Sequence, residues 1–477
     1  MPVTDEQLLE QNPWWRDPAA IARDRKIRDF EAGRFRWDPP VLDAITLGPG
    51  RVHTLRGPRQ VGKSTTAKRL IRRLLEAGER RVLYYSFDLS RDHADIADVV
   101  RRARLLHPDP EGPWYLFLDE VTTMSDWQLG VKYVVDSGPA HEDFILCTGS
   151  SAHRLGSEQL PGRKGAGRHY LQLPVSFRDF CRSAAGIVLP EETVTPGGAV
   201  SPEGLRIIRS LYLARDDLER AWRIYREVGG FPAAIDDWLV HGAVGERTTG
   251  MLWDMIASDV RALGRDDAAT LKLLERVGRS LGTPLAWASL ADDMDVTLPT
   301  ARDYVRVLAE SFVLLTVFFW DPGGGVSARK QRKVYFIDPL ISRVARSIVP
   351  GSRAPSDDAI RENLVAIGLF RSATERLLQA EATLGSIGFW RSGRGTEIDF
   401  VTAEPVQGLR AERFPIEVKG DSATAIANAR RSISAVFGRG LIVTERLFQP
   451  DHVIPAIPAP VLLAGLTERT ERKPLSI

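Results

Sequence analysis

Short apolar runs alternate with stretches of helical period over residues 52–173. The runs are VHTL at 52–55, VLYYSF at 82–87, YLFLD at 115–119, FILCTG at 144–149 and HYLQL at 169–173. After each of the first three runs, apolar residues recur at helical spacing. Strands that alternate with helices predict a parallel sheet with right-handed crossovers. We therefore expect a doubly wound α/β core over residues 45–188, preceded by an N-terminal extension at 1–44.

The pattern changes after a loop-like stretch at 189–204, which is rich in Pro, Gly and Thr. Residues 205–263 have helical periodicity and predict a helical lid. Residues 264–345 predict three helices and a two-stranded wing, which is the arrangement of a winged helix. A long helix followed by four short strands predicts a second α/β unit over residues 355–477.

Composition and charge limit the class of protein. Of the 477 residues, 43% are hydrophobic and 26% are charged, which excludes a disordered or collagen-like chain. The formal net charge of +2 excludes a histone-like protein but permits local basic patches. Cys147 and Cys181 are too few for a disulfide framework or a cysteine-cluster zinc site.

The same features predict a cytoplasmic protein with no membrane partner. Few cysteines favour a reducing compartment, and the N-terminal residues do not resemble a signal peptide. The longest nearly apolar run, 312–320, is too short to span a bilayer.

A phosphate-binding loop follows the first apolar run. The residues G-P-R-Q-V-G-K-S match G-x-x-x-x-G-K-[ST], between a predicted strand and a predicted helix. Backbone N–H groups and the helix N-terminus bind phosphates in such a loop. Lys63 is expected to reach the β- and γ-phosphates of ATP, and the Ser64 hydroxyl to ligate Mg²⁺. The expected nucleotide-binding residues are Gly57, Pro58, Arg59, Gln60, Val61, Gly62, Lys63, Ser64 and Thr65.

Two carboxylates end the third apolar run. Asp119 and Glu120 emerge at the carboxyl end of a predicted buried strand, where ligands of open α/β sheets bind. We expect Asp119 in the Mg²⁺ shell and Glu120 to orient and polarise the attacking water. Thr148, at the end of the next strand, is the candidate sensor of the γ-phosphate, and Ser150 is a weaker candidate.

Two arginines precede the fifth run, within PGRKGAGR at 161–168. In ring ATPases an arginine at this place reaches the γ-phosphate of a neighbouring subunit and stabilises the developing charge. Arg163 is the first candidate and Arg168 the second. Either would imply a homo-oligomer, with a hexamer favoured. The alternative is that both are solvated loop arginines.

Carboxylates also end two predicted strands near the C-terminus, EIDFV at 397–401 and PIEVK at 415–419. Asp399, Glu417 and Lys419 match the D…E-x-K pattern of restriction-endonuclease-like cores. With Glu362 on the preceding helix, they are candidates for a site that holds one or two Mg²⁺ or Mn²⁺ ions. Lys419 would activate or orient water. The alternative is a solvated ion pair in a domain that binds DNA or docks a partner without cleavage.

The predicted winged helix is basic. Its third helix is expected to expose Arg302 and Arg306, and its wing contains RKQRK at 329–333. These residues predict phosphate contacts on either side of a helix that enters a DNA groove. The alternative is a lid or an inter-subunit spacer whose charges lie in solvent.

The ordered set of motifs resembles a known family. The motifs are GPRQVGKST, YLFLDE, TGSS, LPGR, PVSFRDF, EVGGFP, KVYFIDP, ENLVA, EIDFV and PIEVK, over about residues 45–445. They are similar to the bacterial and archaeal AAA-type P-loop ATPases with a C-terminal domain that is uncharacterised and nuclease-like, of the PD-(D/E)XK type. The N-terminal stretch with Trp14 and Trp15 departs from this pattern. We expect it to pack on the core, with covering of the nucleotide base as the alternative.

Two hypotheses of function follow. The first is a ring-forming AAA+ ATPase that acts as a motor on duplex or branched, Holliday-junction-like DNA, with a nuclease domain whose activity is open. The second is a switch in which the ATP state controls docking of a protein partner by an inert C-terminal domain. The basic wing favours the first hypothesis.

Overall fold

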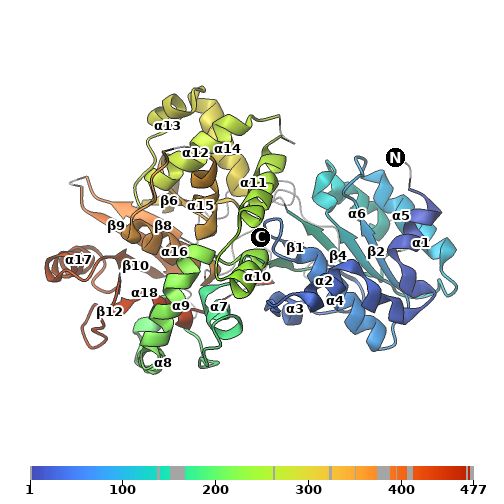
Figure 1. The fold of residues 1–477 in the computed structure, drawn as a ribbon, viewed down its shortest axis with the longest axis horizontal. Helices are drawn as coiled ribbons and strands as arrows, with labels where there is room; N and C mark the ends of the chain where they lie inside the picture. Colours follow the sequence, from blue (N-terminus) through green and yellow to red (C-terminus); the bar gives the residue numbers. More distant parts are fainter. Residues whose placement is uncertain are drawn as a thin grey trace. The chain divides into compact units, whose positions relative to one another are not determined.

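The computed structural model describes residues 3–136, 140–150, 167–261, 264–321, 325–349, 351–372, 387–393, 395–404, 412–468 and 471–472. The chain divides into two compact units (Figure 1). The first is Met1–Leu173 with Thr470–Ile477, and the second is Pro174–Arg469. Within the described residues, every helix is too short or too polar to cross a membrane.

A six-stranded sheet forms the centre of the first unit, in the order β13-β5-β1-β4-β3-β2. Its strands are β1 (Arg51–Arg56), β2 (Val82–Ser86), β3 (Tyr115–Asp119), β4 (Phe144–Gly149), β5 (His169–Leu171) and β13 (Glu471–Arg472). Strands β1 to β5 are parallel and correspond to the five predicted apolar runs, whereas β13 pairs antiparallel with β5. The predicted doubly wound α/β sheet is confirmed.

Helices cover both faces of this sheet (Figure 1). Leu83 and Leu116 pack against α5 and α6 on one face, and Tyr84 and Phe117 pack against α4 and the N-terminal segment on the other. Because side chains alternate along a strand, one apolar run can supply both cores. The helices of this unit are α1 (Asp5–Gln11), α2 (Arg25–Ala32), α3 (Val41–Ala44), α4 (Lys63–Glu76), α5 (Ala94–Leu106) and α6 (Trp127–Asp136), with short 3-10 turns η1 (Pro13–Trp15), η2 (Pro18–Arg23) and η3 (Val121–Thr123).

The N-terminal extension covers the edge strand β2. The Asn12 side-chain amide donates to the Tyr84 carbonyl (2.9 Å) and its oxygen accepts from the Tyr84 N–H (2.7 Å), as a neighbouring strand would. The indole N–H groups of Trp14 and Trp15 both donate to the Val82 carbonyl, at 2.9 and 2.8 Å. The expectation that the Trp14-Trp15 stretch packs on the core is therefore confirmed.

The second unit begins with helices and ends in a mixed sheet. Its helices are α7 (Phe177–Ser183), α8 (Pro202–Tyr212), α9 (Arg215–Val228), α10 (Pro232–His241), α11 (Glu246–Arg261), α12 (Asp267–Arg279), α13 (Trp287–Met294), α14 (Leu298–Glu310), α15 (Pro339–Ile348), α16 (Asp357–Ser372), α17 (Ala423–Val436) and α18 (Ala459–Gly465), with a 3-10 turn η5 (Gly198–Val200). Helices α12 to α14 precede the antiparallel strands β6 (Leu314–Asp321) and β7 (Gly325–Phe336). This is the order expected of a winged helix.

The two wing strands belong to a larger sheet. The seven-stranded sheet has the order β12-β11-β10-β9-β8-β6-β7. Its other strands are β8 (Ile387–Arg391), β9 (Glu397–Glu404), β10 (Glu412–Val418), β11 (Leu441–Thr444) and β12 (Ala456–Pro458). Strand β6 joins it through parallel pairing of Phe318 and Phe319 with Gly388 and Phe389. The sheet therefore contains strands from both the predicted winged helix and the predicted C-terminal domain.

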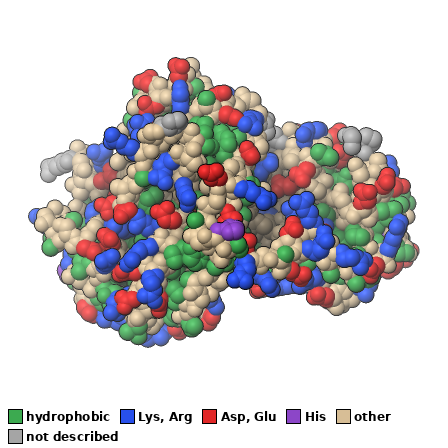
Figure 2. All heavy atoms as spheres, in the orientation of Figure 1, with side chains coloured by type: hydrophobic (Ala, Val, Ile, Leu, Met, Phe, Trp, Pro, Cys, Tyr) green, Lys and Arg blue, Asp and Glu red, His purple; other side chains and the backbone are tan. Residues whose placement is uncertain are grey.

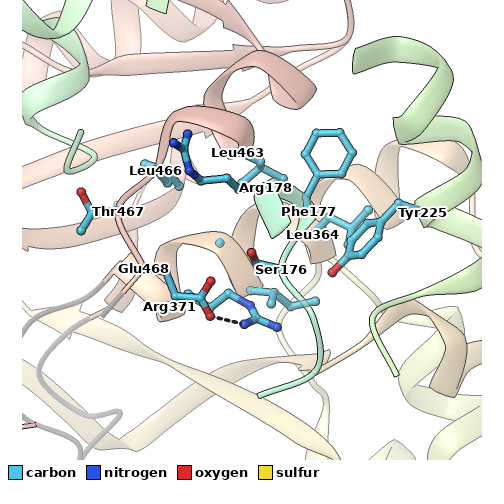
Figure 3. Close-up of a pocket in the computed structure, with 12 residues that line it drawn as sticks. Ser176, Phe177, Arg178, Tyr225, Leu364, Arg371, Leu463, Leu466, Thr467 and Glu468 are labelled. Atoms are coloured by element: carbon cyan, nitrogen blue, oxygen red, sulfur yellow. Dashed lines mark hydrogen bonds and ion pairs between the residues drawn. The ribbon is translucent and has the colours of Figure 1, made fainter. Parts of the chain in front are cut away.

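Two buried polar groups tie the second unit together. The Asp338 carboxylate accepts hydrogen bonds from the N–H groups of Gly230 (2.7 Å) and Leu340 (3.0 Å). Burial raises its pKa to about 6. Arg371 donates to Glu468 (2.7 Å) beside a cavity of about 30 Å³, where the two side chains point toward each other (Figure 3). A cavity of that size can hold a water molecule.

Candidate functional site

The phosphate-binding loop requires glycine at its first position. Gly57 has φ +148°, and a Cβ there would lie 1.8 Å from the Gln172 backbone oxygen. Gly62 has φ +92° and immediately precedes α4, whose first residue is Lys63. The loop thus leads directly into the N-terminus of a 14-residue helix, where N–H groups point toward an anion. The local structure predicted for residues 57–65 is present.

The Gln172 side chain forms hydrogen bonds with the phosphate-binding loop and with the first turn of α4. Its side-chain Nε2 donates to the Val61 carbonyl (2.7 Å), and its Oε1 accepts from the Thr66 hydroxyl (3.0 Å). Its backbone N–H donates to the Arg56 carbonyl (2.8 Å), which extends the pairing of β5 with β1. The sequence analysis did not identify this residue. The signal for it was a polar side chain within the otherwise apolar run HYLQL.

The Lys63 side chain folds back onto the phosphate-binding loop. Its Nζ donates to the carbonyls of Gly57 (3.0 Å) and Pro58 (2.9 Å) and lies 3.8 Å from Glu120 Oε1. The side chain is buried. Two of its hydrogen-bond acceptors are neutral carbonyls, and an anionic phosphate would be a stronger partner of the ammonium than either.

Asp119 is fixed by two hydroxyl groups. It ends β3 in a buried position, where Tyr84 donates to Oδ2 (2.6 Å) and Thr148 donates to Oδ1. Thr148 also accepts from the Glu120 N–H (3.1 Å). The structure therefore brings Lys63, Asp119, Glu120 and Thr148 to one edge of the sheet, at the carboxyl ends of β1, β3 and β4.

Glu120 has an unusual backbone and environment. Its φ is +52°, in the left-handed region that a residue other than glycine rarely adopts. Burial raises the pKa of its carboxyl, and the nearby Lys63 ammonium acts in the opposite direction. Ser150, the weaker sensor candidate, is buried one residue past β4.

Tyr84 is the second site residue that the sequence analysis missed. Burial and the neighbouring Asp119 carboxylate raise its pKa well above the ordinary value, so the hydroxyl stays a donor. The Lys68 ammonium lies 3.5 Å from the centre of the Tyr84 ring and pairs with Asp24 at 3.1 Å. The N-terminal extension thereby contacts a residue that positions Asp119. A tyrosine in an apolar strand gave no sequence signal for this role.

The donor set of the nucleotide site suits magnesium. Ser64 supplies a hydroxyl and Asp119 a carboxylate, and hard oxygen ligands of this kind are the ones that Mg²⁺ prefers beside nucleotide phosphates. When bound, the ion would neutralise charge on the β- and γ-phosphate oxygens.

Of the two candidate arginines, the structure describes only Arg168. Arg163 lies outside the described residues. Arg168 lies at the amino end of β5, where its N–H donates to His53 Nδ1 (2.9 Å) and its carbonyl accepts from the Thr54 N–H (3.0 Å). Because β5 is parallel to β1, Arg168 lies at the opposite edge of the sheet from the phosphate-binding loop. Arg168 therefore lies away from the nucleotide site of its own unit.

The structure also brings the C-terminal candidates together. Glu362 comes from α16, Asp399 from β9 and Glu417 from β10, and Lys419 follows β10 directly. The Lys419 ammonium lies 2.7 Å from Glu417 Oε2 and 2.9 Å from Asp399 Oδ2, and the Val418 N–H also donates to that oxygen (2.9 Å). The residues of the predicted D…E-x-K pattern are therefore in contact in the folded chain.

Two further residues belong to it. Glu397 lies on β9, and Lys333 comes from the wing strand β7. The Lys333 ammonium lies 2.8 Å from Glu397 Oε1, 3.2 Å from Glu362 Oε1 and 3.3 Å from Asp399 Oδ1. Its side chain is 0% exposed. The expectation that Lys333 contacts DNA phosphates is therefore wrong, because the ammonium is buried among carboxylates.

These contacts perturb the titration of the cluster. Burial, with the Asp399 carboxylate next in effect, raises the pKa of Glu417 to about 9 and that of Glu362 to about 7. Burial alone would also raise the pKa of Asp399, but Lys333 and Lys419 hold it below its ordinary value.

The cluster does not fit a divalent metal ion as it stands. Both oxygens of Asp399 already face ammonium groups, and Glu362 also accepts from the Tyr335 hydroxyl (2.7 Å). In the part of the chain that the structure describes, no group of three or more His, Cys, Asp or Glu side chains is arranged to hold a metal.

The side chains of Arg329 and Lys330 in the wing lie outside those that the structure describes, whereas those of Arg302, Arg306 and Arg332 are described. Arg302 and Arg306 are exposed on α14, as expected. Arg306 is paired with Asp303 and, at 3.0 Å, with Glu310. Arg302 and Arg332 lie 5.6 and 5.7 Å from the ring of Trp287. Figure 2 shows basic and acidic side chains next to one another over the face that it draws.

A family model covers the region that contains the candidate nucleotide site. Residues 49–181 match the family model described as an AAA domain (AAA_14), and residues 219–348 match a domain of unknown function (DUF8612). No curated protein gave a significant match. The first unit thus carries an AAA-type P-loop ATPase domain, and the enzyme class of the chain is ATP hydrolase.

Comparison with solved structures gives low similarity to three proteins. Orc1 from Aeropyrum pernix, solved in complex with DNA, has 16% sequence identity and a TM-score of 0.30 over 73% of this chain and 93% of that one. A RuvB variant from Thermotoga maritima has 17% identity and a TM-score of 0.22 over 69% and 93%. Cdc6p from Pyrobaculum aerophilum has 13% identity and a TM-score of 0.22 over 72% and 98%.

Proposed function

We propose that this chain is a Mg²⁺-dependent ATPase that works as a homo-oligomeric motor on DNA. The observation that carries the ATPase part is the convergence of Lys63, Asp119, Glu120 and Thr148 at the carboxyl ends of parallel strands. In the proposed cycle, ATP phosphates take the loop N–H groups and the Lys63 ammonium leaves its two carbonyl partners for the β- and γ-phosphates. Ser64 and Asp119 would hold the Mg²⁺ shell.

Glu120 would orient the attacking water in this scheme. The water oxygen forms a bond to the γ-phosphorus, the bond from that phosphorus to the bridging oxygen of ADP breaks, and the water proton is released. Burial raises the pKa of Glu120 and Lys63 opposes that shift, which supports a carboxylate able to accept a hydrogen bond from water. Thr148, already bonded to Asp119 and to the Glu120 N–H, would report the γ-phosphate to both.

The test is a pair of substitutions with matched controls. Lys63→Ala should abolish ATP binding, whereas Glu120→Gln should retain ATP and lower turnover by at least about 100-fold. Lys132→Ala and Glu111→Gln change exposed residues of the same unit and should leave both properties unchanged. Wild-type turnover in Lys63→Ala would remove the assignment.

The oligomer rests on the place of Arg168. An arginine at the edge opposite the phosphate-binding loop lies away from the nucleotide of its own subunit, so a role at ATP would require a neighbouring subunit, as in a ring and, by analogy with ring ATPases, a hexamer. Sedimentation of Glu120→Gln with ATP should give an assembly larger than a monomer. Arg163→Ala or Arg168→Ala should lower turnover while ATP binding persists. A monomer at all ATP concentrations would refute this part.

DNA is the proposed partner because of the surface around Trp287. Exposed Arg302 and the neighbouring Arg332 flank this ring, and arginines beside an aromatic group suit phosphates and bases. Duplex or four-way, Holliday-junction-like DNA should stimulate ATP turnover. Arg302→Ala should weaken DNA binding and lower its salt slope by about 0.9. Arg223→Ala, which removes an exposed arginine of α9, is the control.

A second function is favoured by the C-terminal cluster. The predicted restriction-endonuclease-like domain retains Asp399 and Glu417 on neighbouring strands, yet lysines already face its carboxylates. We propose that this domain does not cleave DNA. If DNA fails to stimulate ATP turnover, the alternative is an ATP-state switch in which this domain docks a protein partner. Incubation of the full chain with plasmid DNA and Mg²⁺ or Mn²⁺ tests cleavage directly.

A further inference from the structure

Lys333 contacts the C-terminal cluster from a strand that is not adjacent to the strands of the cluster. In the order of the sheet, β6 and β8 separate its strand β7 from β9, which carries Glu397 and Asp399. The contact is therefore not a ladder pairing between neighbouring strands. It is made by a long side chain that reaches two acidic residues of β9 and one of α16.

The geometry matches the hydrogen-bonding capacity of an ammonium group. A lysine ammonium has three N–H donors and no acceptor. Lys333 has three carboxylate oxygens within 2.8–3.3 Å, one each from Glu397, Glu362 and Asp399. Its 0% exposure leaves these carboxylates as partners in place of water.

A divalent cation would need the same oxygens. Mg²⁺ binds oxygen ligands at about 2.0–2.1 Å in octahedral geometry, and Mn²⁺ uses similar ligands. An ion at that distance from Asp399 Oδ1 and Glu362 Oε1 would lie against the Lys333 ammonium, which contacts both atoms. On the other side, Asp399 Oδ2 and Glu417 Oε2 face Lys419.

We propose that Lys333 is a built-in counter-ion, whose ammonium takes the place of a divalent cation among Glu362, Glu397 and Asp399. The cluster then serves to tie the wing strand β7 to β9 and α16, and the wild-type chain holds no Mg²⁺ or Mn²⁺ there. This inference does not depend on the proposed ATPase cycle, because its residues all lie in the second unit.

The experiment measures Mn²⁺ binding to the full chain without nucleotide, by the loss of the electron paramagnetic resonance signal of free Mn²⁺. Wild type and Asp399→Asn should bind the same amount of Mn²⁺, because the cluster of the wild-type chain holds none. Lys333→Met, which keeps the length of the side chain and deletes its charge, should bind one Mn²⁺ per chain more than wild type. The added site should disappear in Lys333→Met with Asp399→Asn.

Melting temperatures and a second lysine variant provide further checks of the proposal. Lys333→Met should melt at a lower temperature than wild type without Mn²⁺ and recover with Mn²⁺, whereas Lys419→Met should not gain a site of the same affinity. Wild-type binding that Asp399→Asn abolishes would overturn the proposal, and this arm needs no Lys333 variant to fold. A folded Lys333→Met that binds no Mn²⁺ would overturn it as well.

Discussion

The nucleotide site and the C-terminal cluster both set carboxylates beside lysine at the ends of strands, but their lysines have different partners. Lys63 donates to the neutral carbonyls of Gly57 and Pro58 and stays 3.8 Å from Glu120. Lys333 and Lys419 instead lie directly against carboxylates, at 2.7–3.3 Å.

This difference decides what each region can bind. At the nucleotide site, a phosphate can take the Lys63 ammonium from weaker partners, and the Asp119 carboxylate is held by hydroxyl groups that carry no charge. In the cluster, the positive charge is already supplied by the chain itself. A carboxylate and a lysine at motif spacing are therefore compatible with a ligand site or with a closed ion network, and the partner of the lysine distinguishes the two.

Breaking the cluster should give the largest effect on stability. Asp399→Asn removes the charge that Lys333 and Lys419 share, and loss of one member of a buried ion pair typically costs about 3–5 kcal/mol. We expect the second unit to lose about that much free energy of unfolding, measured by urea denaturation, while ATP turnover at the first unit persists. Asp358→Asn is the control, because its pair with Arg361 has a 76% exposed carboxylate and should contribute little.

The two units should respond to pH in opposite directions. Burial lowers the pKa of His53 to about 4 from an ordinary 6.5. The unfolded chain then binds a proton at higher pH than the folded one, so stability of the first unit is present above pH 6.5 and is lost as pH falls toward 4. The loss should approach about 3 kcal/mol. His169, whose pKa burial lowers to about 3, adds to it.

In the cluster the sign is reversed. The folded pKa values of Glu362 and Glu417, about 7 and 9, lie above the ordinary 4.5, so the folded chain holds these protons more tightly. That contribution is fully present below pH 4.5 and is lost as pH rises from 4.5 toward 7 for Glu362 and toward 9 for Glu417. Hydrogen exchange of peptides from β1 and β4 against peptides from β9 and β10 should reveal the two trends. His53→Gln should flatten the first trend and Glu417→Gln the second; equal slopes in both units would contradict the comparison.

The sequence predicted the local structure around the proposed nucleotide site because its parts are contiguous in the chain. The loop, the start of α4 and the strand end at Asp119-Glu120 are each encoded by contiguous residues, whose spacing the chemistry of phosphate binding fixes. The strands of the first sheet also follow from apolar runs. The proposed roles of Arg163 and Arg168 depend on a second subunit, and they stay predictions.

The parts that the sequence did not predict come from tertiary contacts. Gln172 reaches Val61 across 111 positions, and Lys333 reaches Asp399 across 66. Lys333 stands in a basic stretch, RKQRK, so the composition of that stretch suggested contact with solvent and phosphate, whereas in the fold Lys333 is buried among acidic side chains. No periodicity within a strand encodes which distant carboxylates a lysine will meet.

Of the changes considered, Tyr84→Phe at the nucleotide site should have the smallest effect. Tyr84→Phe removes only the hydroxyl that donates to Asp119 Oδ2, and loss of an outer hydrogen bond to a metal ligand typically weakens metal binding about tenfold. We expect the Mg²⁺ concentration for half-maximal turnover to rise by about that factor, with a smaller change in turnover at saturating Mg²⁺. Tyr85→Phe is the matched control, since its hydroxyl makes a 3.5 Å contact with Gln7 away from the site. If Tyr84→Phe lowers the melting temperature but leaves the Mg²⁺ requirement unchanged, Tyr84 is a packing residue only. If instead the Mg²⁺ requirement rises and Asn12→Ala, which loosens the N-terminal extension on β2, raises it too, that extension acts on Asp119 through Tyr84.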